Sequence, residues 1–327
     1  MAAAHRMTLV LSIGTAILSS SALAGPGGNG NGNGKPDGSG GGSSLEIQGT
    51  DGPDDFCFGT NTGGVTGTEN DDSIYGAGGD DDLCGFGGND QLWGDGGDDY
   101  IDGGPGNDAI RPGDGNDTID AGDGDDTILS SSGNDVIDGG PGNDWMPYNS
   151  NDQQLIVDFT AVPGTITNLI TGEVDTVTSV ESIKGTPNDD VFYGGDADES
   201  FGGGRGDDYL DGGPGDDFLG ADRGNDTIIG GPGNDILRGA EHSDTFIFRA
   251  VDYVGLGERD VIEDFNTRAD CISIVPPLAI VPGGIVHMQI ANAGKNSLDT
   301  VITLNAGGTI EVWDVTLDES DLGCASP

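Results

Sequence analysis

The feature that most constrains the fold is a nine-residue period that runs without insertion from Gly67 to Pro147. One block reads Gly-Gly-Pro-Gly-Asn-Asp-Ala-Ile-Arg over residues 103–111, and a second array with the same period covers residues 185–247. The eighth position of every block is apolar, and the sixth is Asp in every block except the one with Glu199. A short fixed period is typical of a solenoid, in which each repeat stacks on its neighbours.

Each block divides into a turn and a short strand. The first six positions favour Gly, Asn and Asp, which adopt tight turns and positive φ angles. The last three, such as residues 118–120, have a strand pattern in which only the middle residue is apolar. Two blocks then make one circuit, so that alternate blocks stack as parallel strands about 4.8 Å apart. We therefore expect an all-β fold, a parallel β-roll with a thin core of eighth-position side chains.

The sixth-position carboxylates are the candidate metal ligands, because the same circuit stacks them above one another. Two such charges one rung apart repel by about 3–4 kcal/mol at an effective dielectric constant near 20. A calcium ion between rungs would relieve this repulsion, since twice its bond length of about 2.3–2.6 Å matches the rung spacing. Magnesium fits less well, and zinc and copper prefer His or Cys. The candidates are Asp72, Asp81, Asp90, Asp99, Asp108, Asp117, Asp126, Asp135, Asp144, Asp190, Asp208, Asp217, Asp226, Asp235 and Asp244.

These blocks resemble GGxGxDxUx, the calcium-binding nonapeptide of RTX (hemolysin-type) proteins. The blocks closest to that consensus begin at Gly103, Gly212 and Gly230, and those at Gly67 and Gly185 look like the family's first repeats. The resemblance implies a roll that folds when Ca²⁺ binds. It also implies about twelve ions, if each array binds two fewer ions than it has blocks.

Other interpretations of the repeats are weaker. Composition alone, with 63 Gly and a net charge of −47, would favour a disordered acidic tract, but the unbroken phase argues for the roll. An EF-hand is not indicated, because no helical pattern flanks an Asp run. Two blocks depart from the consensus: one has Ala197 in the glycine position before Glu199, and the other has His242 in a glycine position.

The segments outside the arrays, residues 67–147 and 185–247, have other patterns. We expect a secretory signal peptide at 1–24, a Gly/Asn-rich linker at 25–44, an N-terminal cap or degenerate repeats at 45–66, a β spacer at 148–184 and a C-terminal β cap at 248–327. The signal peptide ends in an Ala-x-Ala motif and predicts a secreted protein with no transmembrane segment after cleavage. Whether it stays in the periplasm or on the cell surface is left open. Strand candidates are residues 155–159, 174–180, 245–248, 261–265, 271–275, 286–290, 301–304 and 310–315.

Catalytic motifs are absent from the sequence. It has three histidines, His5, His242 and His287, with no H-E-x-x-H and no G-x-S-x-G. Strong negative charge disfavours nucleic acid and anionic membranes as partners. The favoured function is a secreted calcium-binding protein, not an enzyme, with a structural or interaction role and a cell-surface polysaccharide or protein as partner. The alternative is an extracellular enzyme, such as one that modifies polysaccharide, and a basic or aromatic groove would favour it.

Four cysteines in an exported chain predict disulfide bonds. Three pairings are possible, and proximity in sequence favours Cys57–Cys84 together with Cys271–Cys324. Cys57 and Cys84 both take the ninth position and lie three blocks apart. An odd number of blocks places them on opposite sides of a regular roll, beyond the roughly 7 Å that a disulfide spans between Cα atoms. Cys271–Cys324 is therefore the preferred pair, and Cys57 reaches Cys84 only if residues 45–66 leave the path of the roll.

Overall fold

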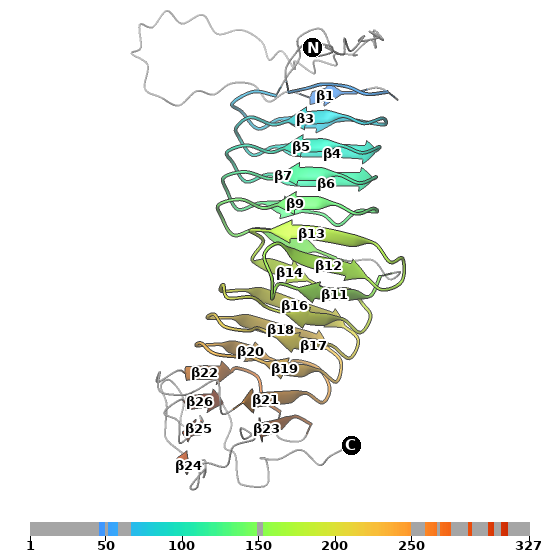
Figure 1. Ribbon diagram of the computed structural model, residues 1–327. Coiled ribbons are helices and arrows are strands. Elements are labelled where there is room, and N and C mark those ends of the chain that lie inside the picture. The colour runs from blue at the N-terminus through green and yellow to red at the C-terminus, as the bar shows by residue number, and fades with distance from the viewer. Residues whose placement is uncertain are drawn as a thin grey trace, which may run out of the picture.

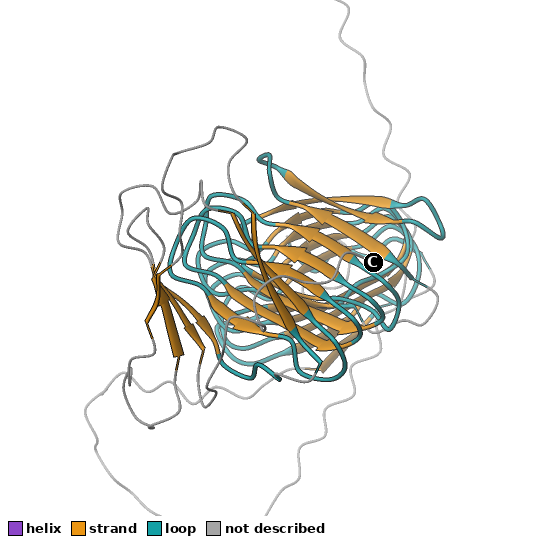
Figure 2. Cartoon of the chain, turned by 90° about the horizontal axis from the view of Figure 1, so that it is seen from below, coloured by secondary structure: helices purple, strands orange, loops and turns teal. Residues whose placement is uncertain are grey.

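The computed structural model describes residues 46–49, 52–57, 67–148, 153–249, 259–266, 269–275, 287–289, 300–303 and 309–312. Within them the chain is all β and coils into an elongated roll whose rungs stack from one end to the other (Figure 1). Figure 2 shows the roll from below as layers of strands joined by turns. No helix in the described part is long and apolar enough to cross a membrane. The predicted signal peptide and linker lie outside the described residues.

Successive repeat strands alternate between two sheets. Sheet A has the order β1 (Glu46–Gln48), β2 (Ser73–Tyr75), β4 (Gln91–Gly96), β6 (Ala109–Asp114), β8 (Thr127–Ile128), β10 (Trp145–Pro147), β14 (Ser182–Lys184), β16 (Ser200–Arg205), β18 (Phe218–Arg223), β20 (Ile236–Arg238), β22 (Arg259–Ile262), β26 (Thr309–Val312), β25 (Thr300–Thr303) and β24 (His287–Gln289). Sheet B has the order β23 (Cys271–Val275), β21 (Thr245–Arg249), β19 (Thr227–Ile229), β17 (Tyr209–Asp211), β15 (Val191–Tyr193), β11 (Leu155–Asp158), β12 (Gly164–Asn168), β13 (Val174–Thr178), β9 (Val136–Asp138), β7 (Thr118–Asp120), β5 (Tyr100–Asp102) and β3 (Asp82–Cys84).

The register within each array confirms the circuit of two blocks. In sheet A, Ile74 pairs with Leu92, and in sheet B, Leu83 pairs with Ile101, each 18 residues on. The eighth-position side chains point inward from both sheets and are buried. They are Ile74, Leu83, Leu92, Ile101, Ile110, Ile119, Ile128, Ile137, Met146, Phe192, Phe201, Leu210, Leu219, Ile228, Leu237 and Phe246. The predicted thin core is therefore present.

The spacer joins the two arrays into one roll. β14 pairs in parallel with β10 on one side and β16 on the other, so sheet A crosses the spacer without a break. In sheet B, β13 pairs in parallel with β9, β12 pairs antiparallel with β13, and β11 pairs antiparallel with β12, so that β11 is again parallel to β15. The sequence indicated β11 and β13 but not β12 or β14, because neither short strand stands out from its neighbours.

The strands after the second array extend both sheets. β22 pairs in parallel with β20, and β23 pairs with β21. Beyond them, β26 pairs in parallel with β22, and β25 and β24 add antiparallel strands at the end of sheet A. All six strand candidates of this region overlap observed strands.

The first rung is out of step with the rest. Ile47 of β1 pairs with Ile74, and Asp55 bridges to Asp82, so the offset is 27 residues instead of 18. Nine extra residues therefore lie between this rung and the next. The shift places Cys57 above Cys84, and the two form a disulfide with Cα atoms 4.9 Å apart. The geometric objection to this pair does not hold, because the roll is not regular here. Cys271 is also disulfide-bonded, and its predicted partner Cys324 lies outside the described residues.

Candidate metal centre

The turns bring backbone carbonyl groups very close to the neighbouring rung. Gly106, in the fourth position of its block, has φ +149°, and a Cβ built there would lie 1.5 Å from the carbonyl oxygen of Gly88 on the preceding rung. Only glycine fits this backbone without displacing a carbonyl. His242 occupies the same position in its block and also has a positive φ, +94°, which is uncommon for a residue other than glycine.

The sixth-position carboxylates form two ladders, one on each side of the roll. In the first, the backbone N–H of Asp90 donates to Oδ1 of Asp108, and the N–H of Asp108 donates to Oδ1 of Asp126, both at 2.7 Å. In the second, the N–H of Asp99 donates to Oδ1 of Asp117 at 2.9 Å. The first ladder holds Asp72, Asp90, Asp108, Asp126, Asp144, Asp217 and Asp235, and the second holds Asp81, Asp99, Asp117, Asp135, Asp190, Asp208, Asp226 and Asp244; all are buried.

Five further carboxylates outside the arrays align with these ladders. Four of them accept a hydrogen bond from the backbone N–H of an array residue at 3.0–3.1 Å: Asp175 from Asp135, Glu181 from Asp144, Asp260 from Asp235 and Asp270 from Asp244. The fifth, Asp54, donates its backbone N–H to the carboxylate of Asp81 at 2.7 Å. Sequence reasoning missed them because the glycine turn is lost at these places. These segments keep only the spacing of the sixth and eighth positions, an acidic residue two positions before an apolar one, and that spacing could have identified them.

Most ladder carboxylates have one oxygen without a hydrogen-bond partner. These oxygens are Oδ2 of Asp81, Asp90, Asp99, Asp108, Asp117, Asp126, Asp144, Asp208, Asp217, Asp226, Asp235 and Asp244, and Oε2 of Glu199, all buried and unpartnered among the described residues. An unpaired buried carboxylate oxygen is costly, so each such atom calls for an explanation.

The space beside most of the unpaired oxygens is also lined by a backbone carbonyl oxygen of the next rung. A Cβ built on Gly103 would lie 2.5 Å from Oδ2 of Asp108 and 2.3 Å from the carbonyl oxygen of Ala121 on the next rung. Carboxylate and carbonyl oxygens are the ligands that calcium prefers. No three Asp, Glu, His or Cys side chains in the described ranges could hold a metal by themselves. A cation in the ladder must therefore take backbone oxygens as well, which the glycine turns supply.

The ladders also raise the pKa of their own carboxyl groups. The pKa of Asp108 is raised to about 7, mainly because the carboxyl group is buried. The hydrogen bond from the N–H of Asp90 lowers this pKa, and the charges of Asp90 and Asp126 raise it. Burial likewise raises the pKa of Asp208 to about 8. The ladder therefore disfavours its own ionised state unless positive charge enters it.

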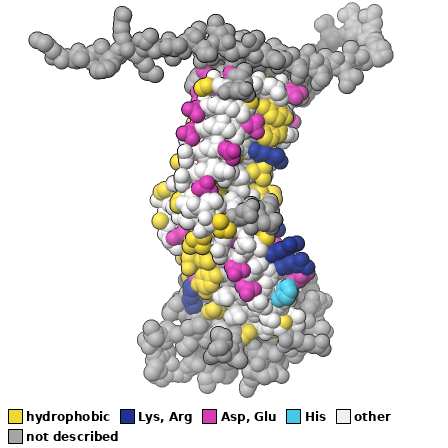
Figure 3. Space-filling view, turned by 90° about the vertical axis from the view of Figure 1, so that its right-hand side faces the viewer, with side chains coloured by type: hydrophobic (Ala, Val, Ile, Leu, Met, Phe, Trp, Pro, Cys, Tyr) yellow, Lys and Arg dark blue, Asp and Glu magenta, His cyan; other side chains and the backbone are white. Residues whose placement is uncertain are grey.

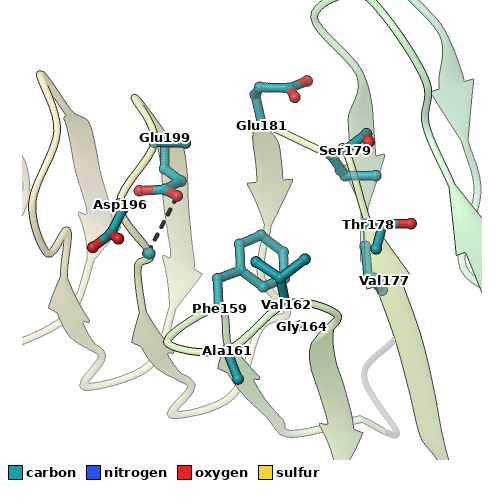
Figure 4. A pocket seen from close by; sticks show the side chains of 13 residues that line it. Phe159, Ala161, Val162, Gly164, Val177, Thr178, Ser179, Glu181, Asp196 and Glu199 are labelled. Carbon is teal, nitrogen blue, oxygen red and sulfur yellow. Dashed lines mark hydrogen bonds between the residues drawn. The ribbon is translucent and has the colours of Figure 1, made fainter.

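Glu199 lies at a break in the first ladder. Its Oε1 accepts from the N–H of Gly195 at 3.2 Å, within its own turn, and burial raises its pKa to about 8 (Figure 4). A cavity of about 330 Å³ separates it from Ser179 and Glu181, with Phe159 on the wall. The turn beside this cavity, Ser179 to Glu181, has three residues where the repeats have six.

The comparisons with known proteins point to one family. The RTX calcium-binding nonapeptide repeat, in a model of four copies, matches residues 65–85, 85–110, 111–146, 178–210, 193–228 and 221–250. No curated protein matches the chain.

Two solved structures are similar to parts of the chain. The extracellular lipase LipA from Serratia marcescens is 16% identical with a TM-score of 0.30, over 86% of this chain and 42% of the lipase. The AlgE6R3 subunit of the Azotobacter vinelandii mannuronan C5-epimerase is 23% identical with a TM-score of 0.19, over 42% of this chain and 78% of the subunit. This chain thus spans less than half of the lipase. Both TM-scores are low, and neither likeness carries a conclusion about activity.

Proposed function

The chain contains several RTX calcium-binding nonapeptide repeats, and on that premise we propose that it is secreted, folds by binding calcium, and has a structural or interaction role. The observation that supports calcium-dependent folding is the row of buried, unpartnered carboxylate oxygens. Most of them face a space that a carbonyl oxygen of the next rung also lines, as beside Gly103. Bound calcium supplies the positive charge that these oxygens lack.

The residues of the roll have separate parts in this function. The sixth-position Asp provides charge with Oδ2 and fixes the rung spacing with Oδ1, which accepts the N–H of the rung before. The glycines let carbonyl oxygens approach, and the eighth-position residues exclude water from the centre. Because that core is one side chain wide in each strand, the stacked charges decide whether the roll is stable.

Calcium-dependent folding is tested on the mature chain by far-UV circular dichroism and small-angle X-ray scattering. We expect gain of β signal and compaction with calcium, and not with magnesium at the same concentration, because magnesium demands shorter bonds and keeps its water. Equal structure in chelator and in calcium would contradict the proposal.

Export is proposed from the signal peptide pattern of residues 1–24. Fractionation of the producing cells, with N-terminal sequencing of the exported chain, tests it. The expected N-terminus is Gly25, after the Ala-Leu-Ala motif, and a chain that retains Met1 inside the cell would contradict it.

A groove on the outer face of sheet A favours a second candidate function, the binding of a polysaccharide. It has a volume of about 300 Å³ and is lined by Trp145, Lys184, Phe218 and Arg238. The guanidinium of Arg238 lies 4.9 Å from the Phe218 ring. Figure 3 shows Lys and Arg side chains mostly on the right-hand side of the view, with a further one at the lower left edge, whereas acidic side chains are scattered. Aromatic faces suit the stacking of sugar rings, and the two cationic side chains, whose charges are paired with neighbouring carboxylates, offer N–H donors for sugar oxygens.

Affinity electrophoresis with acidic and neutral polysaccharides tests the groove. Trp145→Ala and Phe218→Ala should weaken retardation of the calcium-loaded protein. Val136→Ala is the control, because Val136 is exposed on sheet B, away from the groove. Equal retardation of all variants would exclude this surface.

A further inference from the structure

Three of the predicted metal ligands differ from the others, because their second oxygen already has a partner. Oδ2 of Asp72 accepts from the N–H of Thr68 at 2.7 Å and from its hydroxyl at 2.8 Å. Oδ2 of Asp190 accepts from the N–H of Thr186 at 2.6 Å and from its hydroxyl at 2.9 Å. These two carboxylates belong to the opening block of each array.

The third case lies inside the first array. The hydroxyl of Ser131 donates to Oδ2 of Asp135 at 2.8 Å. Asp135 otherwise resembles its neighbours in the ladder, since the N–H of Asp117 donates to its Oδ1 at 2.9 Å and its side chain is buried. The block has the usual fourth-position glycine, Gly133, with φ +128°.

The three donors share one position in the repeat. Thr68, Ser131 and Thr186 are each the second residue of their block, four residues before the carboxylate. No other second position in either array carries a hydroxyl; those residues are Gly, Ala, Phe or Asp. The hydroxyl at the second position therefore marks every sixth-position aspartate of the two arrays whose second oxygen is paired.

We infer that these three hydroxyls take the place of an ion, so that Asp72, Asp135 and Asp190 do not ligate calcium. This inference rests on the proposed function, because it says which carboxylates of the ladder the ions use. A carboxylate oxygen that accepts a short hydroxyl bond is already compensated for burial, and a cation would have to break that bond to reach it. Of the fifteen predicted aspartates, twelve keep an unpaired oxygen.

The positions of the three residues agree with this role. Asp72 is the first array carboxylate of its ladder, and Asp190 restarts the other ladder after the antiparallel strands β12 and β11, where the N–H of Leu155 donates to its Oδ1 at 2.7 Å. Asp135 is the last array carboxylate before that interruption. A turn at such a boundary has an incomplete neighbour on one side, so an ion there would lack part of its oxygen shell.

The direct test counts bound ions by native mass spectrometry of the calcium-loaded chain. Asp135→Asn and Asp117→Asn are matched variants on adjacent rungs, and both keep an amide oxygen that can accept the inter-rung N–H. We expect Asp117→Asn to bind fewer ions than the wild type and Asp135→Asn to bind the same number. Equal losses for the two variants would overturn the inference.

The second part of the test looks for a variant that binds an additional calcium ion. Ser131→Ala leaves Oδ2 of Asp135 without a donor, as in the other blocks, and should add one ion. Ser130→Ala, in the same turn, is the control and should add none. An unchanged count for Ser131→Ala would also overturn the inference. If the wild type binds no calcium, the proposed function itself fails, whereas calcium binding with an equal loss in both Asn variants refutes the hydroxyl role alone.

Discussion

Replacement of Asp108 by Asn should weaken calcium-dependent folding more than replacement of Glu199 by Gln. Asp108 is flanked by Asp90 and Asp126 one rung away on either side, and its Oδ1 accepts the Asp90 N–H at 2.7 Å. An Asn keeps that acceptor but removes the charge from the unpaired Oδ2. The Glu199 carboxylate instead bonds within its own turn, at the break in the ladder.

The expected size of the effect follows from the charge that is lost. One unit charge at about 3 Å from a divalent cation contributes about 11 kcal/mol at an effective dielectric constant of 20, and relief of the repulsion from the two neighbouring rungs offsets about 7 kcal/mol of it. If folding takes up about twelve ions together, a net loss of about 4 kcal/mol raises the calcium concentration at half-folding roughly 1.8-fold. Asp108→Asn should also bind fewer calcium ions than the wild type.

Calcium titration followed by circular dichroism measures the midpoint, and isothermal calorimetry measures the bound calcium. Glu199→Gln should move the midpoint by a smaller factor. Equal shifts and equal losses of calcium for Asp108→Asn and Glu199→Gln would refute the assignment of Asp108 to a regular rung.

Three other predictions follow from the geometry. The pKa of Asp208 is about 8 in the folded roll, above the value of an unfolded Asp. The cation-free roll therefore binds protons and gains stability in acid, and it loses that stability as the pH rises from about 5 to 8. More β signal in chelator at pH 8 than at pH 5 would contradict this. Gly106→Ala should lower the melting temperature of the calcium-loaded roll, since its Cβ would overlap the Gly88 carbonyl, whereas Gly52→Ala, with nothing within 4 Å, should not; equal melting temperatures would count against the turn geometry. Cys57→Ser should cost about 3 kcal/mol in urea unfolding, because the disulfide with Cys84 closes a 27-residue loop; an unfolding midpoint that reduction of the wild type leaves unchanged would argue against it.

The period of the sequence was sufficient to predict the core and the ladders. Because two nine-residue blocks make one circuit, the side of the roll and the rung of Ile110 or Asp108 follow from counting alone. The same counting failed wherever the number of residues per rung changes. Asp175 and Glu181 join the ladders through a spacer whose turn is shorter, and Cys57 reaches Cys84 through a rung that is nine residues longer.

The state of each carboxylate oxygen could not be predicted from the period. Asp117 and Asp135 occupy equivalent positions, and the difference between them comes from one hydroxyl, that of Ser131, at hydrogen-bonding distance. Such a contact depends on the local backbone and on a side-chain rotamer, which a nine-residue pattern does not specify.

The unbroken passage of sheet A through the spacer has a mechanical consequence. Trp145 of β10 is paired to Ser182 of β14, and β14 is paired to β16, so a tension applied along the roll passes from one array to the other through backbone hydrogen bonds. Sheet B crosses the same region through antiparallel strands, which carry load by a different route. The two arrays are thus joined by hydrogen-bonded strands on both sides, one strand in sheet A and three in sheet B, and the roll should resist tension at the spacer as a single body.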